Sequence, residues 1–175
     1  AGAALVQPLE SLGVRVYVAN VERIADVLAT TQRLGRLLGV PDRGDSLAAA
    51  LRSGLEAVRA CFAADARPAV LYLLWPDPPR TAGAGTYIDE VIGIAGGENP
   101  FRDVSGWPEI ALEEILRRAP DYVVVPTGKA TMVRPELLAA RPGWREQPAF
   151  REGRVVKVEA DLYERPGPGV VAAAR

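Results

Sequence analysis

The sequence contains no histidine and only one cysteine, Cys61, among its 175 residues. Without histidine, the chain lacks the commonest general base of enzymes and the commonest metal ligand of proteins. A single cysteine forms no disulfide within the chain, and no Ser-His or Cys-His catalytic pair can be built. These absences weigh against an enzyme and exclude a metal cluster of the cysteine type.

The sequence also lacks a long apolar run and a strong charge of either sign. No run approaches the roughly 20 apolar residues that span a bilayer, and the net charge is −1. A chain so close to neutral has no electrostatic footprint for nucleic acid or an anionic membrane. The chain begins at Ala1 without a signal peptide, which predicts either a processed protein or a fragment.

Two patterns that resemble chemical motifs are incomplete. Gly83-Ala84-Gly85-Thr86 precedes a predicted helix, but it matches neither GxGxxG nor GxxxxGKS/T, so it does not predict a phosphate site. The aspartates are scattered without the spacing of metal ligands. No metal site is therefore predicted.

Residues 81–126 are the most strongly patterned stretch of the chain. The turn at 81–86 contains glycines that can adopt positive φ, and Thr86 can cap the helix that follows. That helix is predicted at 87–95, where apolar residues recur at helical spacing up to Gly96. The stretch therefore opens with a turn that fixes the start of a helix.

Helices and strands alternate along the chain. A second helix is predicted at 109–118, with acidic residues first and arginines last, as the helix dipole prefers. Residues 122–125 are typical of a strand buried on both faces. The other predicted elements are helices at 1–13, 21–38, 45–64 and 135–140, strands at 15–18, 69–74 and 154–159, and the start of a helix at the C-terminus. This alternation predicts an α/β fold with a parallel sheet and right-handed crossovers.

In a parallel α/β sheet, ligands bind at the carboxyl ends of the strands. Three loops leave such ends, at 75–85, 127–132 and 160–169, and the loop with Trp107 can lean over the same edge. Together these loops offer Trp75, Arg80, Trp107, Tyr163 and Arg165. Aromatic surfaces with guanidinium groups suit a large, flat, partly apolar ligand with polar edges, such as a corrin or a porphyrin. The residues predict a binding site rather than a reaction centre.

The same residues also have structural interpretations. Trp107 can plug the side of the domain, Trp75 can pack at its strand end, and Trp144 is expected to be structural. Glu113 lies in the first turns of a predicted helix, where the dipole favours a carboxylate by about 0.3–1 kcal/mol. A small α/β enzyme and a protein-interaction module therefore remain alternatives to a small-molecule binder.

The order of the motifs TAGAGT, AGGEN, GWPEIALEEIL and APDYVVV resembles the C-terminal lobe of bacterial periplasmic substrate-binding proteins. The similar branch has a helical backbone and serves ABC importers of cobalamin, haem and ferric siderophores, and its cobalamin-binding members are the most similar. The resemblance covers nearly the whole chain, although most of the family's N-terminal lobe is missing. It implies a remnant of that lobe at 1–41 (a strand and a helix), a connecting backbone helix at 42–67, and a Rossmann-like α/β ligand-binding lobe at 68–175.

The resemblance also implies roles for single residues. Trp107 is expected to contact the ligand, with Gly85 beside it. Tyr163 matches an aromatic position on the rim of the cleft, from which it could instead ligate haem iron as a phenolate. These residues are expected to form the aromatic part of the site.

Charged residues complete the implied assignments. Arg80 stands where the compared cobalamin binder has an aromatic residue, which admits an anionic ligand group. The arginine of the family's final signature is absent, so its role is lost or has moved to Arg165. Glu113 matches a glutamate that forms an ion pair with arginines of the membrane permease.

The resemblance finally implies a transport role without a cofactor or a structural metal. The expected ligand is cobalamin, with haem and ferric siderophores as alternatives, and the expected partners are ABC permease subunits in the membrane. The expected location is periplasmic or extracytoplasmic and membrane-anchored. Half a cleft buries only half of the ligand surface, so the chain alone is expected to bind weakly or not at all. A swapped or head-to-head dimer could replace the missing lobe.

Overall fold

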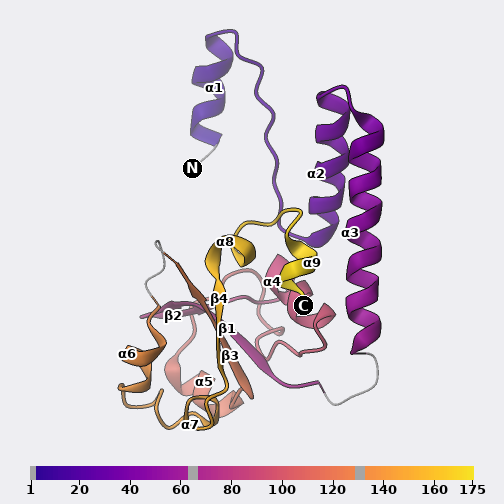
Figure 1. Ribbon diagram of the computed structural model, residues 1–175. Helices are drawn as coiled ribbons and strands as arrows, with labels where there is room; N and C mark the ends of the chain where they lie inside the picture. Colours follow the sequence, from indigo (N-terminus) through magenta and orange to yellow (C-terminus); the bar gives the residue numbers. More distant parts are fainter. Residues whose placement is uncertain (1–2, 63–66, 129–132) are drawn as a thin grey trace.

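Three parallel strands form the centre of the structure, a computed structural model that describes residues 3–62, 67–128 and 133–175 (Figure 1). The elements are α1 (Ala3–Ser11), α2 (Ile24–Leu37), α3 (Pro41–Cys61), β1 (Val70–Pro76), β2 (Pro79–Thr81), α4 (Tyr87–Ile94), α5 (Leu112–Arg118), β3 (Tyr122–Thr127), α6 (Pro135–Ala139), α7 (Pro148–Arg151), β4 (Val155–Glu159), α8 (Ala160–Tyr163) and α9 (Val170–Ala173). The strand order is β2-β1-β3-β4, and the edge strand β2 runs antiparallel to β1. The predicted α/β fold with a parallel-rich sheet is confirmed.

Alternating side chains on the inner strands bury both faces of the sheet. On β3, Val123 and Val125 are fully buried on one face, while Val124 packs against the opposite core. On β1, Leu71 belongs to the same core as Val123 and Val125, and Tyr72 to the core against which Val124 packs. Such strands need cover on both sides, as parallel sheets in α/β proteins generally do.

Helices supply that cover in two layers (Figure 1). One core gathers residues of α3, α4 and α9 against the sheet, and the other gathers residues of α5, α6 and α7. Representative buried side chains are Leu55, Ile88 and Val170 in the first core and Ile115, Leu138 and Ala149 in the second. The sheet is thus held between helices, and its strand ends remain available for a site.

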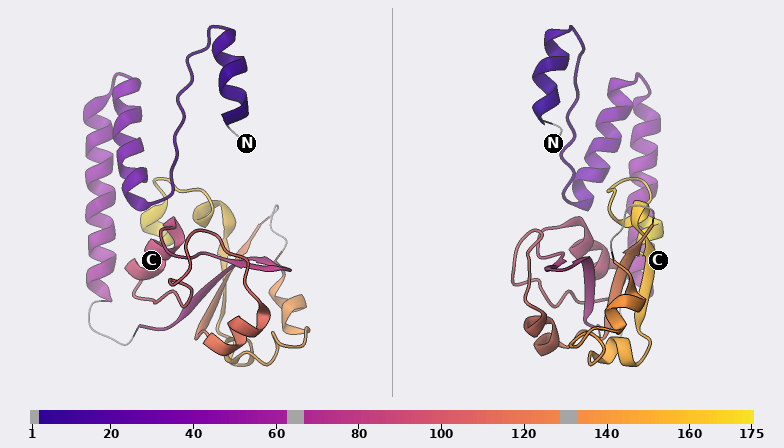
Figure 2. Two further views of the ribbon diagram at one scale, coloured as in Figure 1. Left: turned by 180° about the vertical axis from the view of Figure 1, so that it is seen from behind. Right: turned by 90° about the vertical axis from the view of Figure 1, so that its left-hand side faces the viewer.

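Helices α2 and α3 form an antiparallel hairpin that stands beside the sheet (Figures 1 and 2). Their backbones approach each other at Gly35 and Gly44, where a Cβ atom added to Gly35 would lie 2.8 Å from the Cα atom of Gly44. Only glycine permits this approach. Ile24 on α2 and Leu55 on α3 also belong to the core of the lobe. The hairpin is therefore packed on the lobe rather than free of it.

Helix α3 begins earlier than the sequence pattern predicted. Its first residue is Pro41 instead of a residue near Asp45, because proline is well suited to the first helical turn. Its 21 residues give a length of about 31 Å at 1.5 Å per residue. Neither α3 nor any other helix within the described ranges is long and apolar enough to cross a membrane.

The prediction of a strand at 15–18 is wrong. Residues 14–20 have no regular secondary structure and run as an extended segment between α1 and α2. A strand needs a partner for its backbone groups, and within the described part of the chain no strand pairs with this segment. Figure 2 shows α1 and the segment standing away from the sheet, with Leu12 78% exposed.

Candidate functional site

A cavity of about 610 Å³ lies at the carboxyl ends of the strands, where the sequence predicted a site. It is bounded by the end of β1, the turn before α4, the loop that carries Trp107 and the loop after α8. The lining residues are Val21, Glu22, Leu74, Ala84, Gly85, Thr86, Tyr87, Ser105, Gly106, Trp107, Tyr163, Glu164 and Pro166. Of the predicted ligand-binding residues, the structure thus brings together Gly85, Trp107 and Tyr163.

The turn before α4 is fixed by Thr86. Its hydroxyl donates to the carbonyl oxygen of Gly83 at 2.8 Å and accepts from the backbone N–H of Asp89 at 3.2 Å. The cap predicted for Thr86 is confirmed. Gly85 adopts φ +77°, a left-handed conformation that favours glycine. The turn therefore presents backbone rather than a side chain to the cavity at this point.

The loop that carries Trp107 lies directly on this turn. The N–H of Gly83 donates to the carbonyl of Gly106, and the N–H of Ala84 to that of Val104, both at 2.7 Å. A Cβ atom added to Gly83 would lie 2.1 Å from the carbonyl oxygen of Val104. Glycine at position 83 therefore allows the two backbones to touch, and this contact positions the loop that carries Trp107 beside the cavity.

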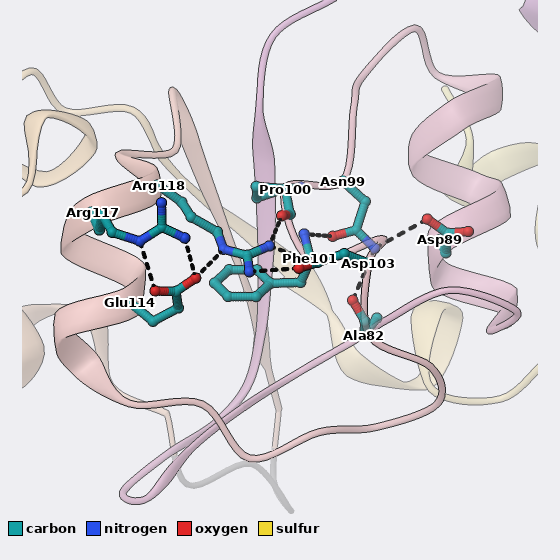
Figure 3. Close-up of polar contacts among 9 residues, drawn as sticks. All are labelled: Ala82, Asp89, Asn99, Pro100, Phe101, Asp103, Glu114, Arg117 and Arg118. Atoms are coloured by element: carbon teal, nitrogen blue, oxygen red, sulfur yellow. Dashed lines mark hydrogen bonds and ion pairs between the residues drawn. The ribbon is translucent and has the colours of Figure 1, made fainter.

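Asn99 fastens the same loop to α4 from inside (Figure 3). Its buried amide nitrogen donates to the carbonyl of Ala82 at 2.9 Å and to the carboxylate of Asp89 at 3.0 Å. Its side-chain oxygen accepts from the N–H of Phe101 at 3.0 Å. One buried side chain thus joins the turn, the helix and the loop, and leaves few of its own polar groups unsatisfied.

Arg118 at the end of α5 holds the loop from outside (Figure 3). Its guanidinium binds both carboxylate oxygens of Asp103, at 2.5 and 2.8 Å, and also the carbonyl of Pro100. The same group lies 4.4 Å from the ring centre of Phe101 and donates to Glu114 at 2.7 Å. The Arg117 and Arg118 guanidinium groups hold the pKa of Glu114 at about 2, below its usual value.

Two tyrosines, Tyr87 and Tyr163, line the cavity, and a third, Tyr72, belongs to the adjoining core. The ring of Tyr163 stacks on Tyr72 with 6.4 Å between centroids. Burial, followed by the proximity of Tyr163, raises the pKa of Tyr87 to about 12, and burial also raises the pKa of Tyr163. Each phenol is therefore neutral at physiological pH. Within the described residues, the buried hydroxyl of Tyr87 has no hydrogen-bond partner.

Three predicted residues are not part of the lining. Trp75 is 38% exposed at the end of β1 and donates to the carbonyl of Asp77 at 3.1 Å. Arg80 lies 3.8 Å from the carboxylate of Glu109, and Arg165 lies 3.2 Å from that of Asp161. Both guanidinium groups are thus engaged by carboxylates beside the cavity. The part of the predicted loop at 127–132 that follows Gly128 lies outside the described residues.

Sequence reasoning missed several lining residues, among them Glu22, Tyr87, Ser105 and Glu164. Glu164 could have been predicted from the sequence, because it directly follows Tyr163 in a loop that was expected at the site. Glu22 could not, since it precedes α2 and reaches the cavity only through the packing of the hairpin. Burial, with the nearby charge of Asp161, raises the pKa of Glu164.

Glu113 lies away from this cavity, in the first turn of α5. Its side chain is exposed, and none of the described residues forms an ion pair with it, whereas its neighbour Glu114 is held by two arginines. Glu113 is therefore a free carboxylate on the surface.

A cavity at the strand ends of a parallel sheet, bounded by aromatic side chains, defines an α/β ligand-binding lobe. The family model for periplasmic binding proteins matches residues 8–162. The chain therefore belongs to the periplasmic binding protein family.

Known relatives agree with this assignment. The uncharacterized ABC transporter substrate-binding lipoprotein YvrC of Bacillus subtilis is 26% identical, over 98% of this chain and 55% of the relative. The vitamin B12-binding protein of Salmonella choleraesuis is 28% identical, over 97% of this chain and 61% of the relative. The periplasmic haem-binding protein BhuT, solved in complex with two haems, is 27% identical with a TM-score of 0.84, over 99% of this chain and 68% of that chain. The chain thus spans 55–61% of the length of these two curated relatives.

Proposed function

We propose that this chain forms one lobe of the substrate-binding component of an ABC importer and that its cavity contacts a metal chelate of the cobalamin class. The observation that carries the proposal is the cavity of about 610 Å³ at the strand ends, lined by Trp107 and Tyr163. Aromatic faces bind large, flat, partly apolar ligands, and no reaction is needed to explain them. Relatives described as vitamin B12-binding and as a substrate-binding lipoprotein support an extracytoplasmic transport role.

Haem and ferric siderophores are the alternative ligands. A haem-binding relative of known structure supports haem, and Tyr163 offers a phenol at the cavity. Burial raises the pKa of that phenol, which opposes the phenolate that would ligate iron. Cobalamin requires no such ligand from the protein, and it is therefore the first candidate.

Titration of cyanocobalamin and haem into the chain tests this proposal, followed by absorbance and calorimetry. We expect cyanocobalamin to bind, and we expect Trp107→Ala to weaken it at least about ten-fold, because a buried aromatic contact contributes roughly 1–3 kcal/mol. Trp75→Ala is the matched control, since Trp75 is similarly exposed but lies outside the lining.

Two results would contradict the proposal. If neither ligand binds, either to the chain or to a version with the upstream lobe restored, the tetrapyrrole assignment fails and ferric siderophores are tested next. If Trp107→Ala and Trp75→Ala weaken ligand binding equally, the ligand does not bind mainly in the cavity.

We also propose that Glu113 docks on arginines of the permease. Its exposure and its freedom from ion pairs among the described residues support this role, because a carboxylate already held by arginines would have to exchange partners. We expect Glu113→Gln to weaken binding to a cobalamin-importer permease in nanodiscs by about three- to ten-fold, with the loss disappearing at high salt. Glu56→Gln, a change of an exposed carboxylate on α3, should have no effect. Equal losses in both variants would indicate general charge rather than docking.

A further inference from the structure

The charged residues that line the cavity, among those that the structure describes, are of one sign. Among the described residues that line it, Glu22 and Glu164 carry charge, and neither lysine nor arginine is present. The arginines closest in sequence to the lining are turned to other partners: Arg23 lies 3.0 Å from Glu90, and Arg165 lies 3.2 Å from Asp161. Arg80, which was expected to admit an anionic group, is also outside the lining and near Glu109.

Neutral polar groups complete the wall. Ser105, on the loop that carries Trp107, lines the cavity and is exposed, so its hydroxyl can donate a hydrogen bond to a ligand. The carboxylates of Glu22 and Glu164 accept hydrogen bonds and cannot donate them when ionised.

We infer that this wall of the site selects a ligand whose edge carries neutral amides, and that Glu164 and Glu22 reject ligands with carboxylates at that edge. An amide fits this wall, because its N–H donates to a carboxylate and its carbonyl accepts from the hydroxyl of Ser105. A carboxylate at the same edge can accept from Ser105, but Glu22 and Glu164 repel it. The inference rests on the proposed function and narrows its ligand class: amide-bearing corrinoids fit, whereas haem, with its propionate carboxylates, does not.

The size of the effect follows from Coulomb's law. Two like charges close to a protein surface repel each other, and salt screens the repulsion. One carboxylate at the edge of the ligand should therefore cost about three- to ten-fold in affinity. The penalty should shrink as salt is added.

The sign of the potential can be measured without any ligand. In a Trp75→Phe background, Trp107 is the exposed tryptophan, because Trp144 is only 2% exposed. We expect iodide to quench its fluorescence less than caesium does, each relative to a free tryptophan amide, at mildly alkaline pH and fixed ionic strength. Glu22→Gln with Glu164→Gln should raise the iodide slope about two-fold. An iodide slope that is already high and does not change would overturn the inference.

A matched pair of ligands provides the second test: cyanocobalamin and a derivative with one peripheral amide hydrolysed to a carboxylate. Wild type should bind the acid about three- to ten-fold more weakly, and the double variant should bind both nearly equally. Glu56→Gln is the control, since Glu56 is an exposed carboxylate on α3 outside the lining, and it should preserve the difference.

The outcomes separate the two proposals. If neither corrinoid binds, either to the chain or to a version with the upstream lobe restored, the proposed function fails. If both bind equally to wild type, or if the double variant keeps the discrimination, the function stands and the inference about ligand charge is overturned.

Discussion

Arg118 is a residue whose role can be separated from that of its neighbour. Its side chain is 16% exposed and binds the loop that carries Trp107, whereas the side chain of Arg117 is 69% exposed and, among the described residues, forms its ion pair with Glu114. The two residues share a charge and a carboxylate partner, but only one of them contacts the loop. Substitution of Arg117 is therefore a control for substitution of Arg118.

We expect Arg118→Leu to release the loop without unfolding the lobe. A hydrogen bond to a charged group contributes about 1.5–3 kcal/mol, so the backbone amides of Ala84 and Gly106 should exchange with solvent at least about ten-fold faster. Hydrogen exchange measured by mass spectrometry checks this, with the amides of β3 as the reference for global stability. Asp103→Asn should give a smaller effect of the same kind.

Arg117→Leu should leave loop exchange unchanged. Equal acceleration in the Arg117 and Arg118 variants, or acceleration throughout β3, would show that Arg118 serves general stability and does not position Trp107.

For single residues, the sequence predicted the contacts that form between residues close together in the chain. Thr86 caps α4 as expected, because its partner is three positions away. Arg80 and Arg165 were expected to face the ligand, but carboxylates engage them. For Arg80 the partner, Glu109, comes close only because the loop folds back onto β2 through the bridge between the two residues. No local pattern contains that information.

Among the elements, the α2–α3 hairpin depends on a glycine contact that can be tested by adding one methyl group. A Cβ atom on Gly44 would lie 3.0 Å from the Cα of Gly35 and 3.1 Å from the carbonyl oxygen of Thr31, which are backbone atoms that cannot rotate away. Gly93 in α4 offers the opposite case, since a Cβ atom there meets nothing within 4 Å.

We expect the two substitutions to change stability in opposite directions. Gly93→Ala should raise the free energy of unfolding by about 0.5–1 kcal/mol, because alanine has the higher helix propensity. Gly44→Ala should lower it by about 1–3 kcal/mol, because the helices must separate. Chemical denaturation followed by circular dichroism measures both. A stabilising Gly44→Ala would mean that the hairpin has room at the contact.

Elements with a clear period and clear ends were predictable, and those without were not. The helix at 87–94 and the strand at 122–127 agree closely with the sequence pattern, because both have apolar periodicity and a marked stop. The three-residue strand β2 was missed, since its proline and the prolines before it suggested a loop, and its pairing with β1 is a tertiary feature. The segment at 15–18 was assigned as a strand on composition alone, but a strand exists only with a partner.

For the whole molecule, how well the chain binds a ligand alone depends on how much of its relatives' length it covers. The chain spans 61% of the Salmonella vitamin B12-binding protein. A cavity built by one lobe covers one side of a large ligand, while binding still costs the ligand its translational and rotational freedom. A second wall adds contact area without repeating most of that cost, so affinity should rise steeply when it is supplied.

A chimera that joins the unmatched upstream part of that Salmonella protein to this chain tests the argument. We expect it to bind cyanocobalamin at least about ten-fold more tightly than the chain alone, as measured by calorimetry. Trp107→Ala in the chimera separates the contributions, because it removes a contact of this lobe and leaves the added part intact. If the variant binds as tightly as the parent chimera, the added part holds the ligand alone. If the chimera binds no more tightly than the chain, this lobe is a sufficient site, and the idea of a shared cleft is wrong.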